Sequence, residues 1–474
     1  MAKAKEMLKG LAGYSIVPIV SGLITILVIP VVSHVFPEDE YGKINLFYSM
    51  GTLLMTACML GLDSSQIRYY FEAPKGLTKC SVRTIAIIVG LGVDLLFVAL
   101  AVLLFPQQVS QYFFGELNLP LIACLGVFIA SLIVFRVVNT DARMEGEVVR
   151  YNAQVILQNF ITKISFVAVG LLFTTRYDAS IVAMTVIMAF ASCWLVFKRR
   201  AGFTFKGSTV TLGAIRTLLA FGIPMMMTTF VLNLNGMVGK IALSGAGLYA
   251  AVGVFAMATT ISNVFTIIPT AFTTYWSPFM YNHYETEQDT IKRVHDLVMW
   301  GSAAIVALII AFQNILFLIV GGGYAACQAY FMLVMTNPIQ ALICETTGYG
   351  IVLKEKPIYN VIASAAGVVI SVIVTFALMD SYGVFAAAFG VAASSFVIGI
   401  MRTVIGQHYY KSVSHPARTA FTAVLILAAC AFNIALCQSI AMEVAAGALL
   451  LAVATFAYRK ELGYLWHSLM KGRS

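Results

Sequence analysis

The sequence predicts an all-α polytopic membrane protein with about fourteen transmembrane helices. The chain of 474 residues is 60% hydrophobic and only 11% charged, with a mean hydropathy of +0.90. Such a composition cannot present an ordinary charged surface to water. Apolar runs of about 20 residues, the length that crosses ~30 Å of hydrocarbon as a helix, recur along the whole chain. The protein therefore acts within or across a bilayer.

The expected spans leave short connections and no room for a soluble domain. The basic start is followed by a run that is too long for a signal-peptide core, so we expect it to be retained as the first helix. The last two spans are expected to hold no deep charge, as suits peripheral helices. The spans cover residues 13–35, 43–63, 84–105, 119–140, 153–173, 180–197, 218–243, 250–274, 297–320, 329–353, 358–379, 383–404, 418–437 and 441–457.

Basic residues follow the topology that these spans imply. If the first residue is cytoplasmic, nearly all Lys and Arg residues outside the spans fall in cytoplasmic segments, and only Lys43 and Arg176 lie on the opposite side. This asymmetry predicts cytoplasmic termini and an even number of helices. The net charge of +9 therefore reflects topology and does not indicate a nucleic-acid partner.

Motifs for catalysis and cofactors are missing from the sequence. The eight cysteines are scattered without a Cys-x-x-Cys pair, and the six histidines are dispersed, so we expect no metal site. There is no phosphate-binding glycine loop, His-Glu-x-x-His or Gly-x-Ser-x-Gly motif. The longest outer connection, residues 106–118, is too short to carry the acids or arginines of a membrane glycosyltransferase. We therefore expect neither an enzyme nor a bound cofactor.

The central stretch Phe221–Phe255 repeats the layout of the first membrane segment. Pro224 precedes Tyr249 by nearly the same distance that separates Pro18 from Tyr41, and each pair lies at a similar place in its half. Weak internal symmetry of this kind is typical of duplicated helical bundles in transporters. The sequence thus indicates a second half that begins near residue 217.

Two acids lie deep within expected spans. Asp94 is in the third span and Glu345 in the tenth. Placing an ionised carboxylate in hydrocarbon costs ~2.5 kcal/mol or more, so each must be paired, protonated or facing a wet cavity. Two readings remain open for both acids: structural pairing, or coupling to a proton or sodium ion.

One half of the fifth span is polar. Lys163 lies at its centre, too far from either interface for easy snorkelling, so it needs an internal partner or an aqueous cavity. A polar contact between two helices is the alternative. The polar residues are Gln154, Gln158, Asn159, Thr162, Lys163 and Ser165.

Further candidates come from other spans. Thr229, Asn233, Gly236 and Lys240 recur at helical spacing and form one stripe that ends in a cation near the outer mouth. Arg136 and Arg402 lie close enough to cytoplasmic ends to snorkel, but they could also line a cavity. Helix packing through Gly236 would account for part of the stripe.

Short motifs along most of the chain resemble the polysaccharide (O-antigen type) flippases of the multidrug/oligosaccharidyl-lipid/polysaccharide exporter superfamily. Members often carry an Asp-Arg pair near the outer part of the seventh helix, where this chain has Gly239-Lys240. This chain therefore has the cation of the pair, Lys240, but not the acid. The matching motifs are Phe-Pro-Glu-Asp-Glu-Tyr-Gly at 36–42, Gly61-Leu62-Asp63 with Ile67-Arg68-Tyr69-Tyr70, Phe221-Gly222-Ile223-Pro224, Gly247-Leu248-Tyr249, Trp276-Ser277-Pro278-Phe279 and Tyr-Gly-Val-Phe-Ala-Ala-Ala at 382–388.

The resemblance implies a fold, a substrate and a location. The fold would have six-helix lobes at 1–216 and 217–404 around a central cavity, with two further helices in 405–474. The substrate would be an oligosaccharide on a polyprenyl pyrophosphate, moved across the cytoplasmic (inner) membrane by alternating access. Expected partners are this lipid-linked oligosaccharide, membrane lipids, a proton or sodium ion, and glycan polymerase machinery.

The residues themselves favour an anionic substrate. A pyrophosphate headgroup needs a wet, cationic path, and Lys163 and Lys240, one from each expected lobe, could form it. The polar groups of Gln158, Asn159, Thr229 and Asn233 would complete the cavity, with Arg136 and Arg402. The alternatives are a cation-coupled multidrug exporter of the same superfamily, which should favour acidic cavity residues, and a membrane polysaccharide polymerase.

Fusion reporters test the predicted topology. A reporter fused after Arg176 should lie outside the cytoplasm, and one fused after Arg200 or Lys471 should lie inside, because the charge asymmetry requires this. An outside location for the Lys471 fusion would contradict the fourteen-helix arrangement.

Overall fold

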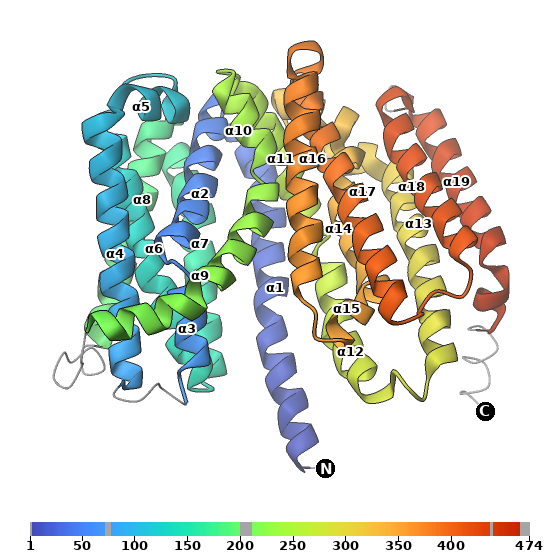
Figure 1. The fold of residues 1–474 in the computed structure, drawn as a ribbon. Helices are drawn as coiled ribbons and strands as arrows, with labels where there is room; N and C mark the ends of the chain where they lie inside the picture. The colour runs from blue at the N-terminus through green and yellow to red at the C-terminus, as the bar shows by residue number, and fades with distance from the viewer. Residues whose placement is uncertain (1, 72–76, 200–210, 437–438, 465–474) are drawn as a thin grey trace. The chain divides into compact units, whose positions relative to one another are not determined.

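The structure is a computed structural model that describes residues 2–71, 77–199, 211–436 and 439–464 (Figure 1). Within these ranges all regular structure is helical, which confirms the predicted all-α class. Thirteen described helices are long and apolar enough to cross a membrane, and the number is fourteen if one bent pair is counted as a span. The topological expectations for Lys75, Arg200, Lys206, Lys471 and Arg473 concern positions outside the described residues.

The chain forms two compact units, residues 1–253 and 254–474. The expected lobe boundary after residue 216 differs from this division because the helices that follow it pack on the N-terminal helices. Lys240 therefore belongs to the same unit as Lys163. The lobe limits 1–216, 217–404 and 405–474 stay a prediction.

Unit 1 is built around a central helix. The most enclosed helix, α6, packs against α2, α4 and α8, and the short helix α5 fills the outer connection that the sequence analysis left without structure. The unit contains α1 (Ala2–Val35), α2 (Glu38–Cys58), α3 (Leu62–Arg68), α4 (Lys79–Leu104), α5 (Pro106–Phe114), α6 (Leu119–Met144), α7 (Val148–Leu172), α8 (Tyr177–Lys198), α9 (Leu212–Asn235), α10 (Val238–Gly245) and the start of α11 (Tyr249–Val264).

Unit 2 contains the remaining spans. Small residues let α16 and α17 approach closely, since a Cβ on Gly390 would lie 2.0 Å from the Thr375 hydroxyl. The helices are α12 (Ile267–His283), α13 (Gln288–Leu318), a 3₁₀ turn (Gly322–Cys327), α14 (Gln328–Thr347), α15 (Tyr349–Leu353), α16 (Ile358–Tyr382), α17 (Val384–Tyr409), α18 (Pro416–Leu436) and α19 (Ile440–Ala457).

A buried acid in α19 corrects one expectation. Glu443 is fully buried, although the last two spans were expected to hold no deep charge. Its carboxylate accepts hydrogen bonds from the side-chain amides of Gln313 (2.6 Å), Asn314 and Gln328 (3.3 Å). Three amide donors compensate the lost hydration of the carboxylate, so α19 is held against α13 and α14 by polar contacts.

The second span is broken into two helices. α2 and α3 meet at an angle of 57°, at a turn where Gly61 has the left-handed φ of +74°. A Cβ on Gly61 would lie 1.9 Å from the carbonyl oxygen of Gly222 in α9, and Tyr69 packs edge-on against Phe221 at 6.0 Å. The Ser65 hydroxyl donates to the Leu218 carbonyl at 2.7 Å. Two motifs that carry the family resemblance, Gly61-Leu62-Asp63 and Phe221-Gly222, thus touch each other.

The turn at Gly61 yields a stability prediction. Gly61→Ala should lower the free energy of unfolding by roughly 1–3 kcal/mol, because the new methyl group meets backbone atoms and the left-handed φ disfavours alanine. Gly92→Ala in α4 is the matched control, since no atom lies within 4 Å of its added Cβ. Thermal unfolding of both purified variants in detergent checks this, and equal melting temperatures would contradict the packing.

Candidate functional site

A row of polar side chains runs along α2. Tyr41, Asn45, Ser49, Thr52 and Thr56 follow one another at helical spacing, and Ser49 donates to the amide oxygen of Asn45 at 3.3 Å. Asn45 in turn lies 3.3 Å from the Tyr41 hydroxyl. A spanning helix with so polar a face must present it to other polar groups or to water.

Lys240 lies against this row. Its side chain is 8% exposed, and Nζ donates to Asn45 Oδ1 at 2.7 Å and to Ser49 Oγ at 2.9 Å. The lysine is carried by the short helix α10, which hydrogen bonds fix to α5: Tyr112 donates to the Ile241 carbonyl at 3.1 Å and Ser244 donates to the Tyr112 carbonyl.

The predicted stripe around Lys240 is not carried by one continuous helix. The expected span 218–243 breaks after α9, at Gly236 and Met237. Asn233 nevertheless also faces α2, with its amide 3.3 Å from the Thr56 hydroxyl. Thr229 is exposed and donates to the Met225 carbonyl of its own helix. The structure thus brings Asn233 and Lys240 to the same helix, α2.

Lys163 meets α1. Its Nζ donates to the Thr25 hydroxyl and lies 3.4 Å from the Ser21 carbonyl oxygen. One turn away, the Asn159 amide donates to the Ser21 hydroxyl at 3.0 Å. The polar half of α7 therefore makes contact with a neighbouring helix, as one of the two readings predicted. Gln158 is half-buried beside it.

Neither lysine has an acid partner. Among the described residues, the hydrogen-bond partners of Lys163 and Lys240 are hydroxyl, amide and carbonyl oxygens, and no ion pair joins either lysine to a carboxylate. Neutral oxygens orient an ammonium group but leave its positive charge unbalanced. Within the part of unit 1 that the structure describes, these two lysines thus have no carboxylate as counter-ion.

Arg136 does have an acid partner, which the sequence analysis did not assign. Its Nε and Nη2 lie 3.0 and 2.9 Å from the same oxygen of Asp63, at the start of α3. The arginine side chain is 52% exposed and the aspartate side chain 19%. Arg136 is therefore held by an accessible carboxylate at the place where α2 breaks.

The two deep acids occupy different surroundings. Asp94 is 4% exposed, and its Oδ1 has no hydrogen-bond partner among the described residues. Glu345 is half-buried in α14 of unit 2. Arg402 of α17 packs beside the backbone of Gly348, which follows α14. Structural pairing and ion coupling therefore both stay open for the two acids.

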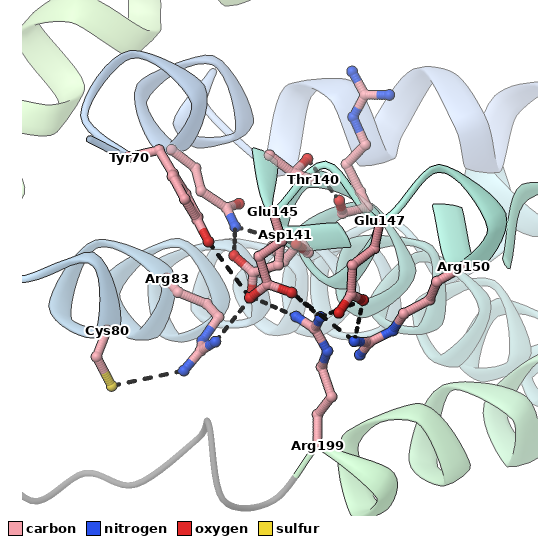
Figure 2. Close-up of polar contacts among 12 residues, drawn as sticks. Tyr70, Cys80, Arg83, Thr140, Asp141, Glu145, Glu147, Arg150 and Arg199 are labelled. Atoms are coloured by element: carbon pink, nitrogen blue, oxygen red, sulfur yellow. Dashed lines mark hydrogen bonds and ion pairs between the residues drawn. The ribbon is translucent and has the colours of Figure 1, made fainter. Parts of the chain in front are cut away.

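An ionic network joins the ends of several unit 1 helices (Figure 2). Asp141 in α6 accepts from Arg83 in α4 at 2.9 Å and from Arg199 at 3.4 Å. Gln66 donates to the other Asp141 oxygen at 2.7 Å, which ties α3 to α6. Burial and the nearby Glu145 carboxylate raise the pKa of Tyr70 to about 12, so its hydroxyl remains a donor.

A mostly apolar cavity lies in unit 2. Its volume is about 660 Å³, and it is lined chiefly by α14, α17 and α18. Gln340, Gln407, Lys411 and several serine and threonine hydroxyls supply its polar groups. None of the predicted site residues lines it.

Comparison with solved structures identifies the fold. A structure described as "Lipid II flippase MurJ, inward closed conformation" has a TM-score of 0.70 at 12% identity, covering 95% of this chain and 99% of its own. An inward-facing multidrug resistance MATE family transporter of the MOP superfamily has a TM-score of 0.58 at 15% identity, covering 87% and 99%. This chain shares the fold of these two structures. At such identities the likeness concerns the fold alone.

Sequence comparison found no match: neither a family model nor a curated protein matches the chain.

Two parts of this arrangement were missed from the sequence. The polar row on α2 repeats at spacings of three and four residues, which is a helical signal that could have been read. The pairing of Arg136 with Asp63 joins residues 73 positions apart, and no local pattern predicts such a contact.

The network around Asp141 yields a stability prediction. Asp141→Asn should cost about 3–5 kcal/mol, because Arg83 and Arg199 lose the buried carboxylate that balances them. Asp178→Asn is the control, since Asp178 pairs with the exposed Arg176 and should change stability by less than about 1 kcal/mol. Melting temperatures in detergent measure both, and a destabilisation by Asp141→Asn no larger than that of the control would refute this role.

Proposed function

We propose that the protein is a flippase that moves a polyprenyl-pyrophosphate-linked oligosaccharide across the cytoplasmic membrane for cell-surface polysaccharide synthesis. The observation that carries this proposal is the pair of cations without counter-ions, Lys163 and Lys240. Transport would proceed by alternating access between the two lobes.

Burying the charges of Lys163 and Lys240 is costly. A lysine at membrane depth is tolerated where an anion or water compensates it. Hydroxyl and amide groups around Lys163 and Lys240 hold the ammonium groups in place without cancelling their charge, so an incoming anion gains the full attraction. A pyrophosphate brings two adjacent negative groups and strong acceptor oxygens. A cationic, hydroxyl-rich surface therefore suits it.

The other predicted residues take roles consistent with this substrate. Asn159, Gln158, Asn233 and Thr229 offer amide and hydroxyl groups that can hydrogen-bond to sugar hydroxyls. Arg136 adds a further accessible cation. The mostly apolar cavity in unit 2 offers space for a hydrocarbon chain.

Asp94 and Glu345 remain the proposed coupling residues, with a proton or sodium ion as the coupled ion. Asp94 is the stronger candidate because its carboxyl group is buried without a charged partner among the described residues. An isolated acid of this kind is stable when protonated and costly when ionised. Its protonation state can therefore be linked to a conformational change.

A cation-coupled multidrug exporter is the second candidate, because the fold is common to a flippase and a multidrug transporter. Cationic drugs require acidic or aromatic surroundings. Asp94 is an acid of that kind in unit 1, but the candidate substrate-binding groups Lys163 and Lys240 are positive, so we favour the anionic substrate. A polysaccharide polymerase is a third candidate that no described feature favours. Glycan polymerase machinery remains a proposed partner.

The proposal predicts how lysine substitutions affect export. Lys240→Gln and Lys163→Gln should each reduce glycan export by about tenfold or more, since a charge-assisted contact to the substrate is lost. Both proteins should still accumulate in the membrane, and the arginine variants should retain part of the activity. Surface glycan and membrane abundance are measured together in a complemented deletion strain.

Arg176→Gln provides the control, since this arginine is 70% exposed and pairs with Asp178. It should export normally. Normal export by both lysine variants at normal abundance would contradict the proposed role, and loss of the protein itself would show that the lysines stabilise the fold.

A further inference from the structure

The ion pair of Asp63 and Arg136 uses only part of each group. Nε and Nη2 of the guanidinium converge on Oδ2 of the carboxylate, at 3.0 and 2.9 Å. Nη1 and the other carboxylate oxygen make no recorded contact with the residues that the structure describes. With the arginine side chain 52% exposed, a second anion could reach the guanidinium without any helix moving.

The fold places this arginine on a face that α2 would otherwise cover. At 100° per residue, Leu125 and Phe128 lie on the same side of α6 as Arg136, and both pack against α2 near Gly51. α2 ends at Cys58 and α3 leaves at 57°, so α6 becomes uncovered at Arg136. An arginine exposed about 12 Å from the cytoplasmic end of its helix requires water or an anion.

Asp63 is held in place independently of Arg136. It lies in the first turn of α3, two residues after the left-handed Gly61, and α3 is tied to α6 by Gln66, which donates to Asp141 at 2.7 Å and to the Val137 carbonyl at 3.1 Å. The segment that carries Asp63 is thus fixed beside α6 by the side chain of Gln66. An ion pair this exposed adds little to the stability of the fold. A role in ligand binding would explain why the two groups are paired.

We propose that Asp63 is a selectivity residue: it occupies Arg136 in place of the pyrophosphate of the substrate and excludes lipids whose headgroups carry a single negative charge. This rests on the proposed function. Ordinary anionic phospholipids, which surround the protein in excess, would otherwise bind an accessible arginine.

The competition depends on charge. A tethered carboxylate acts at high effective concentration, so a phosphodiester that brings one charge gains little by displacing it. A pyrophosphate brings two adjacent phosphoryl groups, which can engage the guanidinium fork at two points. Asp63 then provides selectivity because it competes with the wrong ligand for Arg136. Replacing this acid should abolish the selectivity.

Binding to the purified full chain in detergent tests this. The probes are farnesyl pyrophosphate as ligand and phosphatidylglycerol as competitor. For the unaltered protein, phosphatidylglycerol at about tenfold excess should change the apparent Kd for the pyrophosphate by less than about twofold. For Asp63→Asn the Kd without competitor should be equal or lower, and the same excess should raise it by about fivefold or more.

Two further variants make the result decisive. Asp63→Glu keeps the charge and should keep the resistance to phosphatidylglycerol. Asp178→Asn removes an acid that pairs with Arg176 and should behave like the unaltered protein.

The inference is overturned if Asp63→Asn remains resistant to phosphatidylglycerol, or if it fails to fold, since the acid would then be structural. In both cases binding of pyrophosphate by the unaltered protein would leave the flippase proposal standing. Failure of the unaltered protein to bind farnesyl pyrophosphate would count against both.

Discussion

Hydrocarbon cannot solvate a charge, and this constraint determines how the helices of unit 1 pack. Each ionised group that the unit carries at membrane depth must be met by polar atoms of a neighbouring helix or by water. α2 supplies many of these atoms, because its row of hydroxyl and amide groups receives Lys240 and Asn233. Beyond the end of α2, Asp63 of α3 forms an ion pair with Arg136. The break at Gly61 is therefore part of the same arrangement.

Glycines allow α9 and α11 to pack closely against the two ends of α2. α9 can cross the α2–α3 turn only because Gly61 and Gly222 bring backbone to backbone. The same device recurs at the other end of α2, where a Cβ on Gly42 would lie 2.1 Å from the Tyr249 carbonyl oxygen. Close backbone contacts let polar side chains on adjacent helices reach one another. The motifs behind the family resemblance thus include packing positions as well as polar ones.

The sequence predicted where the helices lie, but not where all of them break or which of them are in contact. Long apolar runs predicted where the spans lie, although some ends differ by several residues, as for α13, which begins at Gln288 and not at residue 297. The break at Gly236 was not predicted because a glycine inside an apolar run is compatible with a straight helix, and the short helix α3 was missed because the second span was expected to end at residue 63. Glu443 was missed because the three amides that permit its burial come from α13 and α14. Lys163 was recognised as needing a partner, but that partner is in α1.

Lys163 and Lys240 as substrate-binding groups favour an anionic lipid-linked substrate over a cationic drug, with Asp94 as the proposed coupling acid. The most direct test is to delete the gene and measure lipid-linked oligosaccharides by mass spectrometry, together with surface glycan. The account predicts that a complete polyprenyl-pyrophosphate oligosaccharide accumulates on the cytoplasmic side while surface glycan is lost. Normal surface glycan with increased sensitivity to cationic drugs would contradict it.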